Sequence, residues 1–71
     1  MTEDEQHRRE VIGRLFALLT AKFEDGAEVA VRGQNRGSTE HREFASSLFD
    51  HANEITAISE ALLLLLGPAN T

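Results

Sequence analysis

The 71-residue chain contains no cysteine, no tryptophan and no tyrosine, and it has a single proline. Without cysteine, it can form neither a disulfide nor a thiolate metal site. A chain of this length buries only about 60% of the surface that its unfolded form exposes. Small domains therefore usually need a disulfide, a metal or a partner subunit for stability. The lack of cysteine also suits a reducing compartment, and we expect a cytoplasmic protein.

Positive charge is scarce, and no apolar run has the length of a membrane span. The chain has twelve acidic residues but only seven Lys and Arg residues, which gives a net charge of −5. This balance disfavours nonspecific binding to nucleic acids or anionic membranes. The most apolar stretch, residues 55–66, includes Ser59 and Glu60, whereas a spanning helix needs roughly 20 apolar residues. The acidic N-terminal segment also lacks the apolar stretch of a signal peptide. We therefore expect neither a membrane nor nucleic acid as the main partner.

The motifs of enzymes and metal sites are missing as well. The sequence has no phosphate-binding loop, no nucleophile motif and no serine–histidine spacing typical of catalysis. Bundles that bind two metals use Glu-x-x-His pairs on facing helices, and this chain has none. Its three histidines, His7, His41 and His51, are expected to be solvated or hydrogen-bonded. We predict no catalytic residue, no metal and no cofactor, and a protein that is not an enzyme.

The first half of the chain predicts one helix over about residues 3–33. Thr2 and Glu5 have the spacing of a capping box. Apolar or small residues then recur at intervals of four and three, as in a heptad seam: Ile12, Phe16, Leu19, Phe23, Gly26, Ala30 and Gly33. Asp25-Gly26 could instead form a turn, with residues 27–32 as a short strand. We favour the continuous helix, because such a strand has only a second subunit to pair with.

The second half predicts a loop over residues 34–37 and a helix over about residues 39–66. Gly33 suits the C-cap of the first helix, and Ser38 or Thr39 suits the N-cap of the second. Gly67-Pro68 is a stop signal, which leaves residues 67–71 as a short tail. His51 is expected on a mainly polar face. The predicted apolar face comprises Phe44, Ala45, Leu48, Ala52, Ile55, Ile58, Leu62 and Leu66, with Phe49 beside it.

A short loop between two helices of similar length predicts an antiparallel hairpin. The fold class is therefore all-α, with residues 1–71 as one domain. Folding the chain about residue 36 places Gly26 and Ala30 opposite Phe44 and Leu48. It also places the leucine run, residues 62–66, opposite the charged residues 6–10. The most apolar part of the chain would then lie beside its most charged part.

Two helices cannot enclose a core, and exposed apolar patches mark association sites. We therefore predict a homo-oligomer, with a symmetric dimer that forms a four-helix bundle as the simplest form. Bringing the open ends of two hairpins together, or forming a higher oligomer, would surround the leucines. The predicted interface comprises Leu62, Leu63, Leu65, Leu66, Ile55, Ile58, Ile12 and Phe16.

The sequence therefore predicts a small, self-associating helical module for interaction or regulation. One alternative is a nucleic-acid-binding hairpin that uses its basic loop, in which Arg32, Arg36 and Arg42 could hold phosphates. No aromatic residue stands in that loop to stack on a base. Another alternative is a subunit that docks its leucine-rich helix end into the groove of a different protein.

Overall fold

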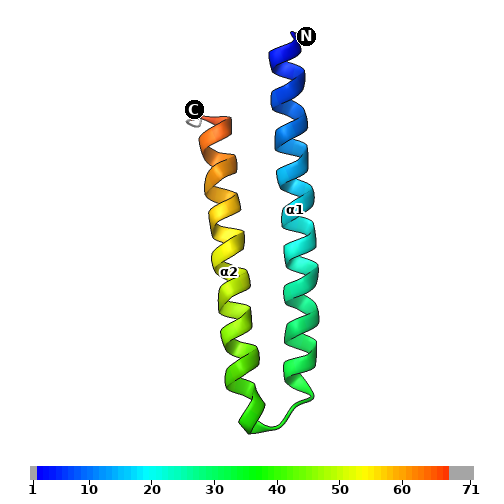
Figure 1. The fold of residues 1–71 in the computed structure, drawn as a ribbon, viewed down its shortest axis with the longest axis vertical. Helices are drawn as coiled ribbons and strands as arrows, with labels where there is room; N and C mark the ends of the chain where they lie inside the picture. Colours follow the sequence, from blue (N-terminus) through cyan, green and yellow to red (C-terminus); the bar gives the residue numbers. More distant parts are fainter. Residues whose placement is uncertain (1, 68–71) are drawn as a thin grey trace, which may run out of the picture.

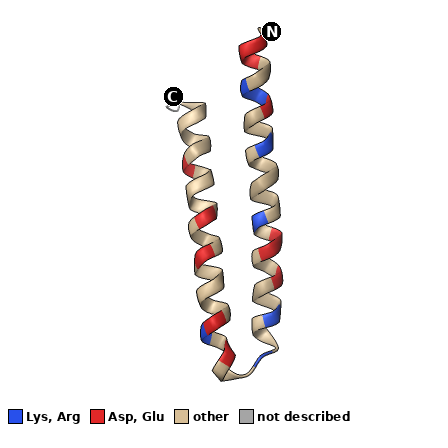
Figure 2. Cartoon of the chain, in the orientation of Figure 1, with Lys and Arg blue, Asp and Glu red and all other residues tan. Residues whose placement is uncertain are grey.

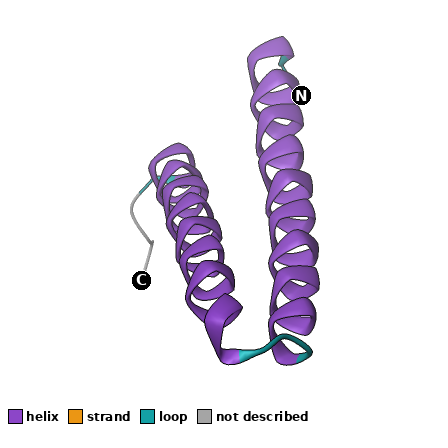
Figure 3. Ribbon diagram, turned by 60° about the horizontal axis from the view of Figure 1, so that its bottom comes forward, coloured by secondary structure: helices purple, strands orange, loops and turns teal. Residues whose placement is uncertain are grey.

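The computed structural model describes residues 2–67, which form two helices and the loop between them (Figure 1). Helix α1 comprises Glu3–Gln34 and helix α2 comprises Ser38–Leu66. The two helices run antiparallel side by side (Figure 1, Figure 3), with overall dimensions of 54 × 21 × 17 Å. The predicted all-α hairpin is confirmed, and its helix bounds agree to within one residue. The predicted tail falls mostly on residues 68–71, which lie outside the described residues.

Helix α1 is continuous through Asp25-Gly26, as predicted. At its N-terminus, the Thr2 hydroxyl oxygen accepts a hydrogen bond from the Glu5 backbone N–H at 3.2 Å. The acids of the first turn also lie at the positive end of the helix dipole. The predicted C-cap at Gly33 is wrong, because the helix continues to Gln34 and Asn35 caps it. The Asn35 backbone N–H donates to the Arg32 carbonyl at 3.1 Å and the Arg36 backbone N–H donates to the Gly33 carbonyl at 3.3 Å, which prolongs the last turn.

Helix α2 begins without the predicted side-chain cap. Gly37 occupies the N-cap position in an extended conformation, and no side chain bonds to the free N–H groups there. Ser38 is the first helical residue, so the capping role predicted for Ser38 or Thr39 is wrong. The helix ends as predicted at Gly67, whose backbone N–H bonds to the Leu63 carbonyl at 3.0 Å. Gly67 has a φ of 78°, which a residue with a side chain rarely adopts.

Two glycines show how α1 and α2 are aligned. A Cβ added to Gly33 would lie 3.3 Å from the Phe44 Cβ, and a Cβ added to Gly26 would lie 4.0 Å from the His51 Cβ. Gly26 thus faces His51, and Gly33 faces Phe44, whereas the sequence predicted Gly26 and Ala30 opposite Phe44 and Leu48. In Figure 1 the first turn of α2 extends below the end of α1. A residue of α2 therefore lies opposite a residue further along α1 than a symmetric fold about residue 36 predicts.

This alignment changes the environment of the leucine run. Counting along both helices from the Gly33–Phe44 and Gly26–His51 pairs places Leu62 opposite Leu15, whereas the sequence predicted charged residues there. Leu62 is 5% exposed and is the single fully buried residue among those described. The N-terminal turns of α1 extend beyond the end of α2 (Figure 1). From there the Arg8 guanidinium donates a hydrogen bond to the Leu65 carbonyl.

The seam between the helices consists of half-buried residues at heptad spacing. In α1 they are Ile12, Leu15, Leu19, Lys22, Gly26, Val29, Ala30 and Gly33; in α2 they are Phe44, Ser47, Leu48, His51, Ile55 and Ile58, followed by the buried Leu62. Phe16 and Phe23, which the sequence placed in the seam, are exposed. Their neighbours Leu15 and Lys22 occupy those positions. His51 also lies in the seam, so its predicted place on a polar face is wrong.

We predict different effects of the same substitution at Gly13 and at Gly33. Gly13 has open space around it, whereas Gly33 packs against Phe44. Alanine in a helix interior is favoured over glycine by about 0.8–1 kcal/mol. Gly13→Ala should therefore raise the free energy of unfolding by about that amount, and Gly33→Ala should gain less because its methyl group crowds the Phe44 ring. Urea denaturation followed by circular dichroism measures both. Equal gains would show that Phe44 does not pack on Gly33.

Candidate interaction surface

One broad face of the hairpin carries no charged side chain. On α1, the positions along this face are Gly13, Phe16, Thr20, Phe23, Ala27 and Ala30; on α2 they are Ala45, Phe49, Ala52, Thr56, Ser59, Leu63 and Leu66. The spacing of three and four residues keeps each row on one side of its helix. We call this surface the groove face. None of these positions carries a charge, and most of them are exposed.

A shallow groove of about 370 Å³ runs between the helices on this face. Small residues form much of its wall, and larger apolar side chains and His51 complete it: Phe23, Gly26, Ala27, Ala30, Leu48, His51, Ala52 and Ile55. Because Phe23 and Ala27 come from α1 and Ala52 from α2, the groove shows that both rows belong to the same side of the hairpin.

Large apolar side chains project on either side of this groove. Phe16 is 53% exposed, Phe23 is 60% exposed, and Phe49 and Leu63 are each 67% exposed. Phe16 precedes Phe23 by two helical turns, and Leu63 follows Phe49 by about four, so they share the groove face. Complete burial of one such side chain contributes about 1.5–3 kcal/mol. Much of the apolar surface of the hairpin therefore stays exposed to water and does not stabilise the fold.

The residues predicted as an oligomer interface divide into two groups. Ile12, Ile55, Ile58 and Leu62 lie in the seam, where they hold the hairpin itself together. Phe16, Leu63, Leu65 and Leu66 are exposed and available to another molecule. Leu63 and Leu66 belong to the groove face, whereas Leu64 points away from it and is the most exposed leucine of the run.

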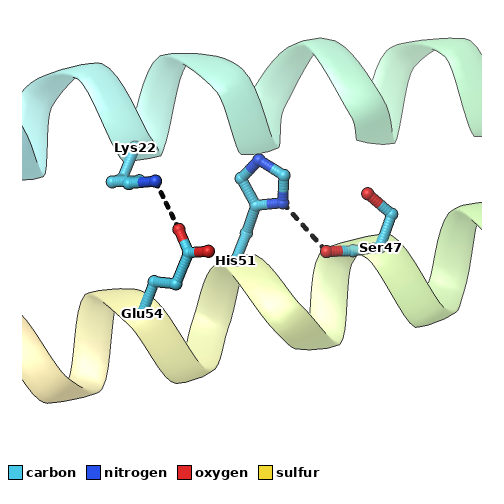
Figure 4. A network of polar contacts seen from close by, with 4 residues as sticks. All are labelled: Lys22, Ser47, His51 and Glu54. Carbon is cyan, nitrogen blue, oxygen red and sulfur yellow. Dashed lines mark hydrogen bonds and ion pairs between the residues drawn. The ribbon is translucent and has the colours of Figure 1, made fainter.

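On the opposite side of the hairpin, two polar contacts form within the chain (Figure 4). The Lys22 ammonium forms an ion pair with the Glu54 carboxylate and joins α1 to α2. One turn from Glu54, the His51 Nδ1–H donates to the Ser47 carbonyl oxygen at 2.9 Å. The bond to Lys22 lowers the pKa of Glu54, and the same bond raises the pKa of Lys22.

Apolar residues lie on this opposite side as well. Leu18 is 43% exposed and Leu65 is 37% exposed, and helical spacing places both on the side of Lys22 and Glu54. A second hollow on this side, of about 360 Å³, has a mixed polar and apolar lining. The three exposed phenylalanines, however, all lie on the groove face.

The three arginines of the predicted anion loop do not converge on one point. The Arg32 guanidinium bonds to Glu28 at 2.6 Å, and the Arg36 guanidinium lies 3.6 Å from the Glu40 carboxylate. Arg42 is exposed on α2. Two of the three positive charges are thus compensated by acids within their own part of the chain, which weakens the loop as a phosphate site.

The other polar candidates are dispersed. His7 and His41 are exposed on different helices, and His51 is held by Ser47. Within residues 2–67, no three His, Cys, Asp or Glu side chains gather closely enough to hold a metal ion. Two acidic residues form ion pairs, Glu28 with Arg32 and Glu54 with Lys22. Neither described helix combines the length and apolarity needed to cross a membrane.

Comparison of the chain with protein-family models, with curated proteins and with solved structures found no match. The groove face therefore has to be interpreted from its own residues. Sequence reasoning missed it because Phe16 and Phe23 were assigned to the seam. The signal that identifies it is the absence of charge at every third or fourth position from Gly13 to Ala30, and again from Ala45 to Leu66.

The ion pair between Lys22 and Glu54 predicts a pH-dependent stability. Because the pKa of Glu54 is lowered from its ordinary value of 4.5, its contribution is lost as the pH falls through and below that value. Because the pKa of Lys22 is raised from its ordinary value of 10.5, its contribution is lost as the pH rises through and above that value. The stability difference between the wild type and Glu54→Gln should therefore be largest between these limits.

Urea denaturation at fixed protein concentration, repeated across this pH range, measures the difference. Glu60→Gln is the matched control, since Glu60 forms no ion pair in the described part of the chain. A Glu54→Gln effect that stays constant from acid to neutral pH would contradict a role for the ion pair.

Proposed function

We propose that this protein is a small, non-catalytic helical module that self-associates through its groove face, and that two hairpins form a four-helix bundle. The observation that carries this proposal is the uncharged apolar face around the groove. Soluble monomers rarely expose a large continuous apolar surface, and such surfaces mark sites of association. With no catalytic constellation in the sequence, we infer that the protein acts by binding, as an interaction or regulatory subunit.

The total surface area supports a partner of about this size. A compact monomer of 7.9 kDa is expected to expose about 4,400 Å², whereas this chain exposes 5794 Å². The excess, roughly 1,400 Å², is larger than the ~800 Å² that each partner contributes to a standard interface. A second hairpin laid on the groove face would bring the exposed area per residue into the range of compact proteins.

The chemistry of the face favours another copy of the chain. An interface between identical subunits is more apolar than one between transient partners, and the groove face has no charge to be matched by a different protein. It also offers both parts of a self-complementary contact, which are projecting rings and a groove of small residues. A two-fold interface requires the same patch to supply both parts.

Adjacent leucines provide a matched test of the groove face. Leu63 lies on it and Leu64 points away, although both are exposed in the hairpin. Leu63→Gln should weaken self-association by about 1.5–3 kcal/mol for each copy, the free energy of burying a leucine. Leu64→Gln should change it by less than about 0.5 kcal/mol, as is usual for surface substitutions. Sedimentation equilibrium over a concentration series measures both variants.

Equal weakening by the two substitutions would show that the leucine run associates without a preferred face. A wild-type chain that is monomeric and weakly helical at every concentration would contradict self-association. It would indicate that a different protein covers the groove face.

A further inference from the structure

We infer that the second copy lies on the groove face with its loop at the opposite end of the bundle, and that the two-fold axis passes Thr56 of α2 and Ala21 of α1. The inference rests on the proposed self-association and specifies its geometry. In this arrangement α1 packs against α1 of the second copy, and α2 packs against α2. The alternative places both loops at one end, with α1 packing against α2 of the second copy.

The first observation concerns the exposed end of α2. With the axis at Thr56, Phe49 and Leu63 are each seven residues from it, so Phe49 of one copy lies opposite Leu63 of the other. Leu66 falls near Ala45 by the same count. The leucine end of each chain is then covered by uncharged residues. With both loops at one end, Leu63 and Leu66 would instead lie level with residues 11–14 of α1, where the uncharged row ends at Gly13, so Leu66 would lie beyond the last uncharged position of that row.

The second observation comes from α1 and agrees with the same axis. The alignment of the hairpin places Ala21 level with Thr56. Phe16 is five residues before Ala21, and Gly26 is five residues after it. Phe16 of one copy therefore lies opposite Gly26 of the other, beside Ala27, where small residues line the groove. A large ring against a glycine and alanines is how facing helices interdigitate. One axis thus places Phe16 of α1 and Phe49 and Leu63 of α2 opposite uncharged residues.

The third observation is the distribution of charge along the hairpin. Residues 2–10 carry four acids and two arginines, whereas residues 28–43, around the loop, carry three acids and three arginines. Figure 2 shows acids at the start of α1, and both acidic and basic residues around the loop at the other end. With the loops apart, the acidic end of each copy lies beside the charge-balanced end of the other. With the loops together, the two acidic ends meet, which is unfavourable.

Single cysteines can measure this geometry, because the chain has no cysteine of its own. Thr56 and Ser38 are both exposed hydroxyl residues of α2. In the inferred dimer, Thr56→Cys of one copy faces Thr56→Cys of the other at the two-fold axis, and mild oxidation should give a disulfide-linked dimer. Ser38→Cys lies 18 residues from the axis, so its two copies should be roughly 55 Å apart at 1.5 Å per residue. They should not cross-link.

Double electron–electron resonance on spin-labelled Ser38→Cys tests the long distance directly. A distance near 55 Å together with efficient cross-linking of Thr56→Cys supports the inference. A distance below about 20 Å, as expected for neighbouring helices of one bundle end, together with cross-linking of Ser38→Cys, overturns the inferred orientation while self-association still stands. A sedimentation mass that shows only monomer for both labelled variants and for the wild type overturns the proposed function itself.

Discussion

A pair of helices has a single line of contact, and this constraint governs the rest of the structure. Each helix of the hairpin can bury one stripe against the other, while most of its circumference stays in solvent. Even the residues at the centre of the seam are therefore half-buried, and Leu62 alone is fully enclosed within residues 2–67. Burial on this scale offsets only part of the conformational entropy lost on folding. What lies outside the seam consequently decides whether the hairpin is stable.

The two sides that flank the seam resolve this constraint in different ways. One side has polar contacts within the chain, with Lys22 bonded to Glu54 and His51 bonded to Ser47. The other side is uncharged, contains the groove and carries the exposed rings of Phe16, Phe23 and Phe49. The hairpin thus has one side with polar groups that are paired within the chain, and another side with apolar rings that no part of the described chain covers. This asymmetry is what makes the groove face a candidate for assembly.

Hydrophobic periodicity, the Thr2 cap and the stop at Gly67 were sufficient to predict the hairpin and the bounds of both helices to within one residue, although the caps expected at the loop were wrong. The orientation of α1 about its own axis was harder to predict. Leu15 and Phe16 both continue a heptad pattern, as do Lys22 and Phe23, and hydrophobicity favours the phenylalanines at both steps. The structure places Leu15 and Lys22 in the seam, where the apolar stem of Lys22 packs inward while its ammonium reaches Glu54. A charged residue with a long aliphatic stem can thus occupy a seam position, although its charge leads one to predict an exposed position.

The near absence of full burial also links the amount of folded protein to its concentration. Where the cover of an apolar face is another copy of the same chain, folding and assembly share one equilibrium, and the native fraction rises with the number of chains present. Chains that are diluted expose the groove face and the leucine end, and unfolded or partly folded chains are removed by proteases. With Leu62 as the one enclosed side chain within residues 2–67, a hairpin of this kind would persist in proportion to how many copies of it are present.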